Sequence, residues 1–173
     1  IPVASRYLKE RSFVKKEVKN RPFSPSEADK YILADKTEDF RVLNLTVDVF
    51  NSSAPSYFHK YVGGYIAVKL RRYQELIEVH LSKEIRNFTA SLRTTNTLGE
   101  AEEIFKQTPV LNMLNTKYVI YAPQAMPISN PYKLGNAWLV DNVNLVNSAD
   151  EEMLSLGLDS LQNTVVVDKA VEN

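Results

Sequence analysis

The chain has 173 residues, of which 44% are hydrophobic and 24% are charged, values that are ordinary for a globular protein. This composition excludes a disordered or fibrous chain, and the length fits one domain with a real hydrophobic core. Lysine and arginine together number 21, as do aspartate and glutamate, so the formal net charge is zero. Because a general nucleic-acid binder normally carries a net basic surface, we expect no nucleic-acid partner.

The chain has no cysteine, which excludes disulfides, thiolate metal sites and a cysteine nucleophile. No apolar run approaches the roughly 18 residues that a membrane-spanning helix needs. The sequence opens IPVASRYLKE without an initiator methionine and stops at DKAVEN, ends that look cut rather than native. We therefore expect residues 1–173 to be one soluble domain of a longer protein, with residues 1–24 as an extended N-terminal arm.

The first predicted elements are a short helix and a strand. Ser24, Pro25 and Glu27 form a capping pattern that predicts a helix over Pro25–Ala34. FRVLNLTV, from Phe40 to Val47, is rich in β-branched and apolar residues and predicts a buried strand. DVFNSSAPS then has the composition of a turn.

The strongest pattern in the chain predicts a long helix from Ile66 to Leu92. Its apolar residues recur every three or four positions and so form one stripe along the helix. They are Ile66, Leu70, Tyr73, Ile77, Leu81, Ile85, Phe88 and Leu92. RTTNTLG ends this helix, and LGEAEEIFKQ begins a second, shorter one.

TPVLNMLNTKYVIYAP predicts a compact helix followed by a strand. Thr108 suits the helix cap, and Pro109 suits the first helical position. Asn115 can take the left-handed conformation that ends the helix before a strand over Tyr118–Tyr121.

The last third of the chain predicts two strands around a helix. AWLVDNVNLV reads as a strand or bent hairpin, Ser148 and Glu151 form a second capping box, and NTVVVDK reads as a final strand. Strands mixed with helices predict the α/β class, here a mixed α+β single domain. We expect a small mixed sheet of about four strands packed by helices, including one long amphipathic helix.

The densest candidate for a binding site is YFHKYVGGYIAVKLRRYQELIE, residues 57–78. Two glycines just before a helix, with cations nearby, can form an anion site because their backbone N–H groups are exposed. The alternative is that the glycines form a turn, the tyrosines are half-buried and the basic residues face water. The candidate ligand-binding residues are Tyr61, Gly63, Gly64, Tyr65, Lys69 and Arg72.

The two histidines, His59 and His80, are weak candidates for chemistry. His80 and Glu84 are one helical turn apart, which suits two metal ligands, but two ligands do not make a site. His59 has the chemistry to polarise a substrate hydroxyl, although no partner acid stands out in the sequence. We therefore assign no catalytic residue and expect neither a metal site nor a cofactor.

Trp138 lies where a loop rich in proline and glycine enters a predicted strand. Core packing is the preferred interpretation, and stacking on a sugar is the alternative. Together with Tyr57, Tyr61 and Tyr65, it would supply the rings of a carbohydrate- or polymer-binding module.

Five segments follow one another along nearly the whole chain: RYLKERSFV, ADKYILADKTEDFRVLNL, YVGGYIAVKLRRYQELIE, LNMLNTKYVIY and NPYKLGNAWLVDNV. These segments resemble the YfhO-like family of large bacterial membrane proteins, in the form found in Bacteroidetes. The residues that match the family motif, which has no established role, are Gly63, Gly64, Tyr65, Lys69, Arg71, Arg72 and Tyr73.

The resemblance implies a polytopic membrane protein similar to the glycosyltransferases that use polyprenyl-phosphate sugars, with this chain as its extracytoplasmic (periplasmic) domain at the bacterial inner membrane. A catalytic acid of such a protein would lie outside this chain. The implied partners are the transmembrane part of the same parent chain and a polyprenyl-phosphate-linked sugar or an envelope glycan. The sequence does not indicate an oligomeric state.

The leading hypothesis is thus a non-catalytic domain that positions an acceptor or donor in cell-envelope glycosylation. A carbohydrate- or polymer-binding module is the first alternative. The second is a stand-alone hydrolase or transferase that uses His59 and a nearby carboxylate as acid and base.

Overall fold

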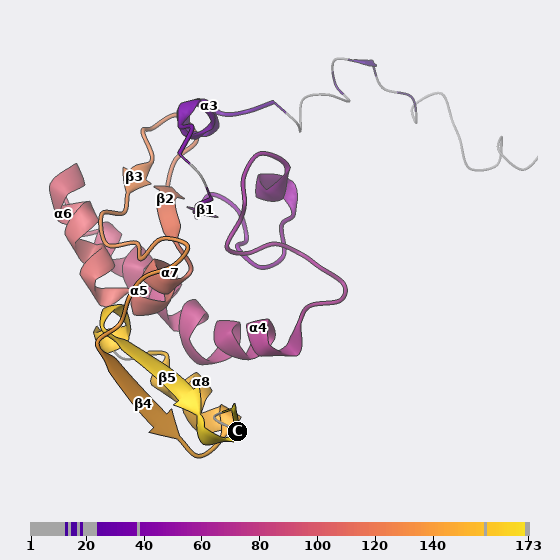
Figure 1. The fold of residues 1–173 in the computed structure, drawn as a ribbon. Coiled ribbons are helices and arrows are strands. Elements are labelled where there is room, and N and C mark those ends of the chain that lie inside the picture. Colours follow the sequence, from indigo (N-terminus) through magenta and orange to yellow (C-terminus); the bar gives the residue numbers. More distant parts are fainter. Residues whose placement is uncertain are drawn as a thin grey trace, which may run out of the picture.

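A computed structural model describes residues 24–37, 39–157 and 159–171, together with Phe13, Lys15, Lys16 and Val18. The predicted N-terminal arm and the segment RYLKERSFV lie almost wholly outside the described residues. The predicted class is confirmed, because the described chain is a mixed α+β fold with two small sheets packed by helices (Figure 1). Among the described residues, no helix combines the length and the apolar character needed to cross a bilayer.

The main sheet has three strands, with β2 (Thr116–Ile120) between β1 (Arg41–Asn44) and β3 (Ile128–Ser129). β1 is parallel to β2, and β3 is antiparallel to it. A single bridge between Val42 and Tyr61 adds the segment around Tyr61 to the free edge of β1. The strand predicted over Phe40–Val47 is shorter than expected, since β1 covers only Arg41–Asn44. The strand β3 was not predicted.

Alternate residues of β1 and β2 face two different cores, as the period of a strand requires. Helix α3 (Glu27–Ala34) covers one face, where the core consists of Ala28, Ile32, Val42, Tyr118 and Ile120. The larger core lies on the other face, beneath the long helix and the helices that follow it. Its residues include Leu43, Val119, Ile128, Leu81, Ile85, Phe88, Phe105 and Leu111.

Helix α3 begins later than predicted because a different serine caps it. Ser26, not Ser24, is the N-cap, and its hydroxyl accepts a hydrogen bond from the backbone N–H of Asp29. The Asp29 carboxylate accepts the Ser26 backbone N–H in return, at 2.8 Å. This reciprocal pair satisfies two backbone donors at the helix start, so the chain becomes helical at Glu27.

The C-terminal end of α3 is fixed to β2 by Asp35. Its carboxylate accepts hydrogen bonds from the Lys117 ammonium at 2.5 Å and from the Tyr118 hydroxyl at 2.8 Å. The bond from Lys117 is the main reason why the pKa of Asp35 lies well below its usual value.

The long helix runs without a break through α4 (Arg71–Leu76), a π-helical turn (Ile77–Leu81) and α5 (Ser82–Leu92). The predicted start at Ile66 is wrong. Ile66 and Leu70 share the helical spacing, but they are exposed, because the chain before Arg71 has no core to pack against. The stripe reaches the core from Tyr73, which packs partly buried against it, and Ile77 is the first fully core member.

The next two α-helices were predicted, but the second half of LGEAEEIFKQ is a 3₁₀ turn and not a continuation of the helix. The elements are α6 (Leu98–Glu103), a 3₁₀ turn (Ile104–Gln107) and α7 (Pro109–Met113). Asn115 adopts a φ of 55°, so it reverses the chain from α7 into β2 as expected. Further 3₁₀ turns cover Ala54–Tyr57, Asp159–Gln162 and Lys169–Val171.

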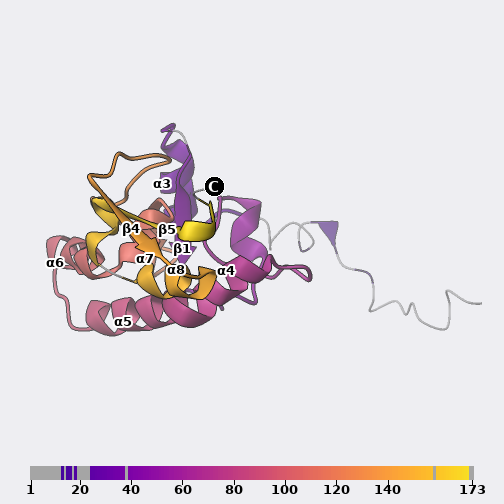
Figure 2. The ribbon, with the colours of Figure 1, turned by 60° about the horizontal axis from the view of Figure 1, so that its bottom comes forward.

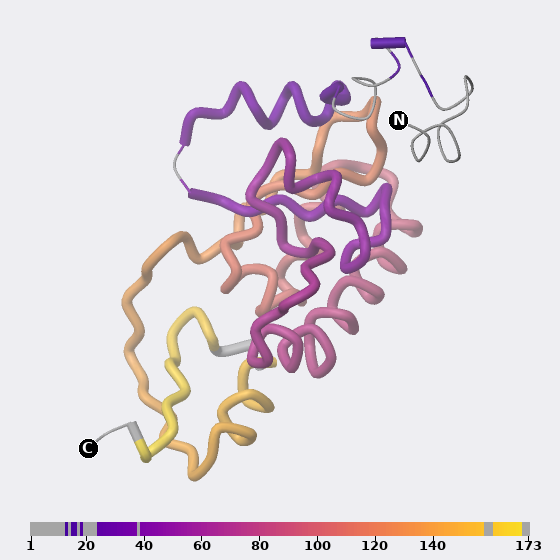
Figure 3. The backbone as a smooth tube through the Cα atoms, turned by 90° about the vertical axis from the view of Figure 1, so that its right-hand side faces the viewer, coloured from indigo at the N-terminus to yellow at the C-terminus, as the bar shows by residue number. Residues whose placement is uncertain are grey.

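The C-terminal unit is a parallel pair, β4 (Asn142–Val146) and β5 (Thr164–Asp168), connected through α8 (Ala149–Ser155). α8 lies against the long helix (Figure 2), and the unit lies at the opposite end of the molecule from α3 (Figures 1 and 3). Polar contacts from the long helix hold it there. The Arg72 guanidinium donates to the backbone oxygen of Ala149 at 3.2 Å and pairs with the Glu152 carboxylate at 3.5 Å. His80 Nε2 lies 2.7 Å from the backbone oxygen of Met153, in the same helix α8.

The main core can be tested at Phe88, which is fully buried with its ring centroid 4.8 Å from that of Phe105. We expect Phe88→Ala to lower the free energy of unfolding by about 3–5 kcal/mol, because it removes a large ring and leaves a cavity. Lys83→Ala, an exposed position on the same helix, is the control and should change stability by less than about 0.5 kcal/mol. Chemical denaturation of both variants makes the comparison, and equal stability would contradict the assigned core.

Candidate functional site

The predicted glycine pair is held by the backbone of Val49. A Cβ at Gly63 would lie 1.8 Å from the Val49 oxygen, so only glycine fits there. The N–H of Gly64 donates to that oxygen at 2.8 Å, and Gly64 has a φ of +109°. The expectation that the glycines stand directly before a helix is wrong, because the helix begins only at Arg71.

The predicted tyrosines have different environments. The Tyr61 hydroxyl donates to the backbone oxygen of Asn44 at 3.2 Å, and burial raises the pKa of Tyr61 well above its usual value. Tyr65 is 62% exposed. Tyr57 is also exposed and packs edge-on against Phe58. The three rings therefore do not share one environment.

The two predicted cations also point to different partners. The Lys69 ammonium lies 5.8 Å from the centroid of the Phe50 ring. The Arg72 guanidinium contacts the Glu75 carboxylate and, on α8, the Glu152 carboxylate, each at 3.5 Å, besides its hydrogen bond to the Ala149 oxygen. The six candidate residues thus adjoin one another along the chain without converging on one hollow. Ligand binding by them stays a prediction.

His59 has the partner acid that the sequence did not reveal. Its Nε2 lies 2.8 Å from an Asp29 carboxylate oxygen, and the His59 side chain is only 3% exposed. Burial acts to raise the pKa of Asp29, but hydrogen bonds from Ser26 and His59 outweigh it and keep that pKa below its usual value. This pair connects α3 to the segment before the glycines, and it is almost wholly buried.

The second histidine does not form a metal pair with Glu84. His80 contacts α8, and its ring is so close to Gly157 that a Cβ there would lie 2.6 Å away. The Glu84 carboxylate instead accepts the backbone N–H groups of Val110 and Leu111, at 2.8 and 3.0 Å. Within the ranges that the structure describes, no three metal-ligating side chains come together.

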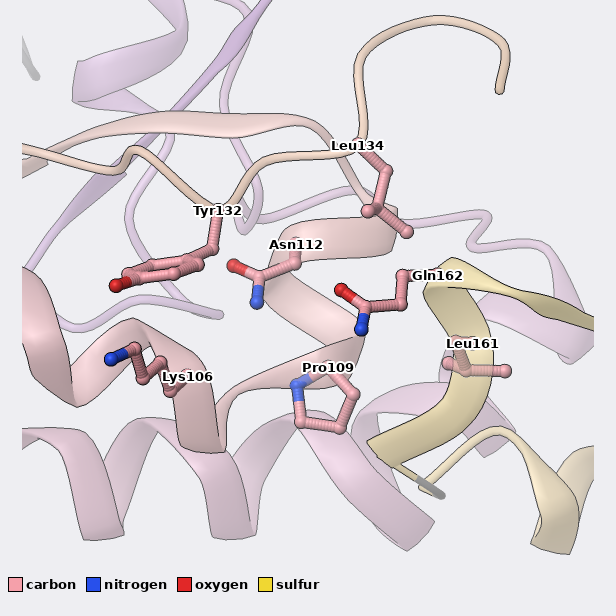
Figure 4. A pocket seen from close by; sticks show the side chains of 7 residues that line it. All are labelled: Lys106, Pro109, Asn112, Tyr132, Leu134, Leu161 and Gln162. Atoms are coloured by element: carbon pink, nitrogen blue, oxygen red, sulfur yellow. The ribbon is translucent and has the colours of Figure 1, made fainter. Parts of the chain in front are cut away.

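A hollow of about 380 Å³ opens between α7, the preceding 3₁₀ turn and the C-terminal unit (Figure 4). One aromatic ring, three apolar side chains and three polar side chains point toward the same space. They are Tyr132, Pro109, Leu134, Leu161, Lys106, Asn112 and Gln162. The sequence did not predict this hollow, since its residues come from three separate parts of the chain.

The aromatic side of the hollow is held in place by Glu103. The Tyr132 hydroxyl donates to one Glu103 oxygen at 2.8 Å, and the Lys106 ammonium pairs with the other. That ammonium also lies 5.5 Å from the centroid of the Tyr132 ring. The hydrogen bond between Lys106 and Glu103 lowers the pKa of Glu103 and raises that of Lys106. Both groups therefore stay charged, and their charges balance.

The two amide side chains of the hollow differ in their freedom. Asn112 is buried, donates to the Phe105 oxygen at 2.7 Å and accepts from Asn130 at 2.8 Å, so its position is fixed. Gln162 is exposed at the edge of the hollow and has no side-chain hydrogen bond to the described residues. It therefore remains available to a ligand.

Trp138 lies beside a second, mainly apolar hollow of about 370 Å³, with Met113, Leu156 and Val166 among its neighbours. Its indole N–H donates to the Leu161 oxygen at 3.1 Å, and 36% of the residue is exposed. The ring is thus partly core, and it does not join the tyrosines of residues 57–65 in one hollow.

Comparison of the chain with family models, with curated proteins and with solved structures finds no match in any of the three. The resemblance to the YfhO-like family therefore stays a prediction.

Gly63→Ala tests whether the glycines serve the fold. We expect it to lower the free energy of unfolding by about 1–3 kcal/mol, because the added Cβ meets the Val49 backbone. Gly99→Ala is the matched control. It meets no atom within 4 Å on helix α6 and should raise stability by about 0.5–1 kcal/mol. A Gly63→Ala protein as stable as the wild type in urea unfolding would contradict this role.

Glu84 predicts a pH dependence of stability. Burial raises its pKa to about 7, although the two amide hydrogen bonds oppose this shift. Since this folded-state pKa exceeds the ordinary glutamate value of 4.5, the stabilisation from protonation is complete below pH 4.5 and is lost as the pH rises through 7.

Glu84→Gln cannot ionise, so the variant should lack this loss. Between pH 5 and pH 8 we expect the wild type to lose about 2–3 kcal/mol of unfolding free energy relative to the variant. Denaturant unfolding at both pH values measures it, and contributions from all other groups are common to the two proteins. Parallel pH profiles would overturn the assignment.

Proposed function

We propose that this chain is a non-catalytic extracytoplasmic domain of a polytopic bacterial membrane protein of the YfhO-like kind, and that it positions a glycan in cell-envelope glycosylation. The hollow beside Tyr132 is the observation that carries this proposal. Its single aromatic ring, apolar floor and amide groups form the mixture with which proteins bind sugars, whose rings have apolar faces and hydroxyl edges.

The charges in the hollow favour a neutral ligand. Lys106 is the one cation in the lining, and the Glu103 carboxylate balances it at contact distance. A phosphate would need an unpaired cation or a cluster of free N–H groups. The sugar portion of a donor or acceptor suits this lining better than a phosphate does.

The buried polar groups support a non-catalytic role. The His59–Asp29 pair is almost wholly buried, and Glu84 uses both oxygens on backbone N–H groups. A general acid or base must reach the proton that it transfers. In the described chain these groups hold elements together, which weighs against the stand-alone hydrolase or transferase.

The proposal is tested by titrating the chain with neutral hexose and N-acetylhexosamine oligosaccharides, followed by NMR. We expect saturable shifts around Tyr132. Tyr132→Leu should abolish them, because it removes the stacking ring, whereas Tyr132→Phe keeps the ring and should still bind.

Gln162 provides the second arm of the test. Gln162→Ala should weaken sugar binding by about twofold to tenfold, the value of one hydrogen bond. Gln107→Ala, an exposed glutamine outside the lining, should bind like the wild type. Binding that survives Tyr132→Leu, or the absence of saturable binding to any of these sugars, would sink the proposal.

A further inference from the structure

The segment that leads into the long helix exposes apolar side chains in a way that folding alone does not explain. Ile66, Val68 and Leu70 are 61%, 87% and 80% exposed, and Tyr65 beside them is 62% exposed. Single exposed apolar residues are common, but a contiguous group marks an interaction surface. The segment projects from the body of the molecule before α4 (Figures 1 and 2).

In this segment the apolar side chains are more exposed than the lysine beside them, which is the reverse of the usual pattern in a loop. Lys69 is less exposed than its neighbours Val68 and Leu70, because its ammonium turns back toward the ring of Phe50. A loop in water normally buries its apolar side chains and leaves the ammonium outside. The orientation suits a loop whose tip meets an apolar medium.

Cations lie immediately behind the apolar tip. The Arg71 side chain is 90% exposed, and Arg72 follows it at the start of α4. The Arg71 guanidinium contacts Glu75 at 2.8 Å, but an exposed pair of this kind is weak and can exchange for another anion. Together with Lys69, three cations lie beside two carboxylates, those of Glu75 and Glu152, so the region keeps an excess of positive charge.

We propose that the segment Tyr65–Arg72 docks on anionic phospholipid head groups. Ile66, Val68 and Leu70 enter the interface, and Arg71 meets the lipid phosphates. Apolar residues backed by arginine and lysine, with a tyrosine at the boundary, are the combination that binds such a surface. This contact goes beyond the proposed sugar site, with which it shares no residue.

A second copy of the chain fits this segment less well. In a symmetric dimer the same patch meets itself, so the arginines of one copy would face those of the other. That arrangement costs electrostatic energy, whereas an anionic bilayer gains it.

The test is flotation of the chain with two kinds of vesicle, phosphatidylcholine alone and phosphatidylcholine with about 30% phosphatidylglycerol, a strongly anionic surface. We expect binding to the anionic vesicles at least about tenfold tighter than to the neutral ones, from two or more basic residues near the surface. Binding should weaken as salt is added, because salt screens the head groups.

A variant separates this segment from the rest of the surface. Val68→Ser with Leu70→Ser should weaken vesicle binding about tenfold or more, because the apolar side chains no longer enter the interface. The matched control is Leu139→Ser with Leu154→Ser, at residues that are 97% and 64% exposed elsewhere in the chain, and it should bind like the wild type. Circular dichroism confirms that both variants are folded.

Three results would overturn the inference. The first is that the wild-type chain does not bind the anionic vesicles. The second is that both double variants lose vesicle binding to the same extent. The third is that the chain binds no vesicle but self-associates, and that Val68→Ser with Leu70→Ser abolishes the self-association. The last result would assign the segment to a second copy. Since the sugar titration uses other residues and another ligand, either proposal can fail alone.

Discussion

One partly buried carboxylate connects the main parts of this protein. Glu84, on the long helix, accepts the first free N–H groups of α7 and so fixes where that helix starts. α7 turns at Asn115 directly into β2, the central strand of the three-stranded main sheet. The position of the central strand against the long helix therefore depends on this carboxylate. An acid held this way is costly when ionised, which is why its environment also couples stability to pH.

The hollow beside Tyr132 depends on the same connection. α7 contributes Pro109 and Asn112 to it, while Leu161 and Gln162 come from the C-terminal unit. Small-molecule sites often lie where two structural units meet, because neither unit closes the space alone. The docking of α8 on the long helix, through Arg72 and His80, therefore sets the width of the hollow from a distance.

Local signals in the sequence predicted local structure well, and failed where a distant partner decides. Pro109 and Asn115 act through their own backbone preferences, so the turn from α7 into β2 could be predicted. The spacing of Ile66 and Leu70 continues the helical period, but a period shows only which residues would share a face. It does not show whether another part of the chain packs against that face, and here the helix starts only at Arg71.

The candidate site shows the same division. The glycines were rightly singled out as backbone positions, but their partner, Val49, supplies one carbonyl that no pattern reveals. The acid paired with His59 and the residues around Tyr132 are likewise brought together only by the fold. Long-range contacts of this kind have no periodicity and no fixed spacing. The sequence therefore indicates which residue types are candidates, but not which of them lie in contact.

The two proposed contacts differ in their chemistry, and this difference matches the ligand that the resemblance implies. The hollow has balanced charge and one aromatic ring, and so suits a neutral sugar. The segment Tyr65–Arg72 combines apolar tips with cations and suits an anionic, lipid-rich surface. A polyprenyl-phosphate sugar has an anionic lipid end and a sugar end. A domain that rests on the membrane by one surface and holds sugar by another would place an acceptor or donor near the bilayer without needing a catalytic group of its own.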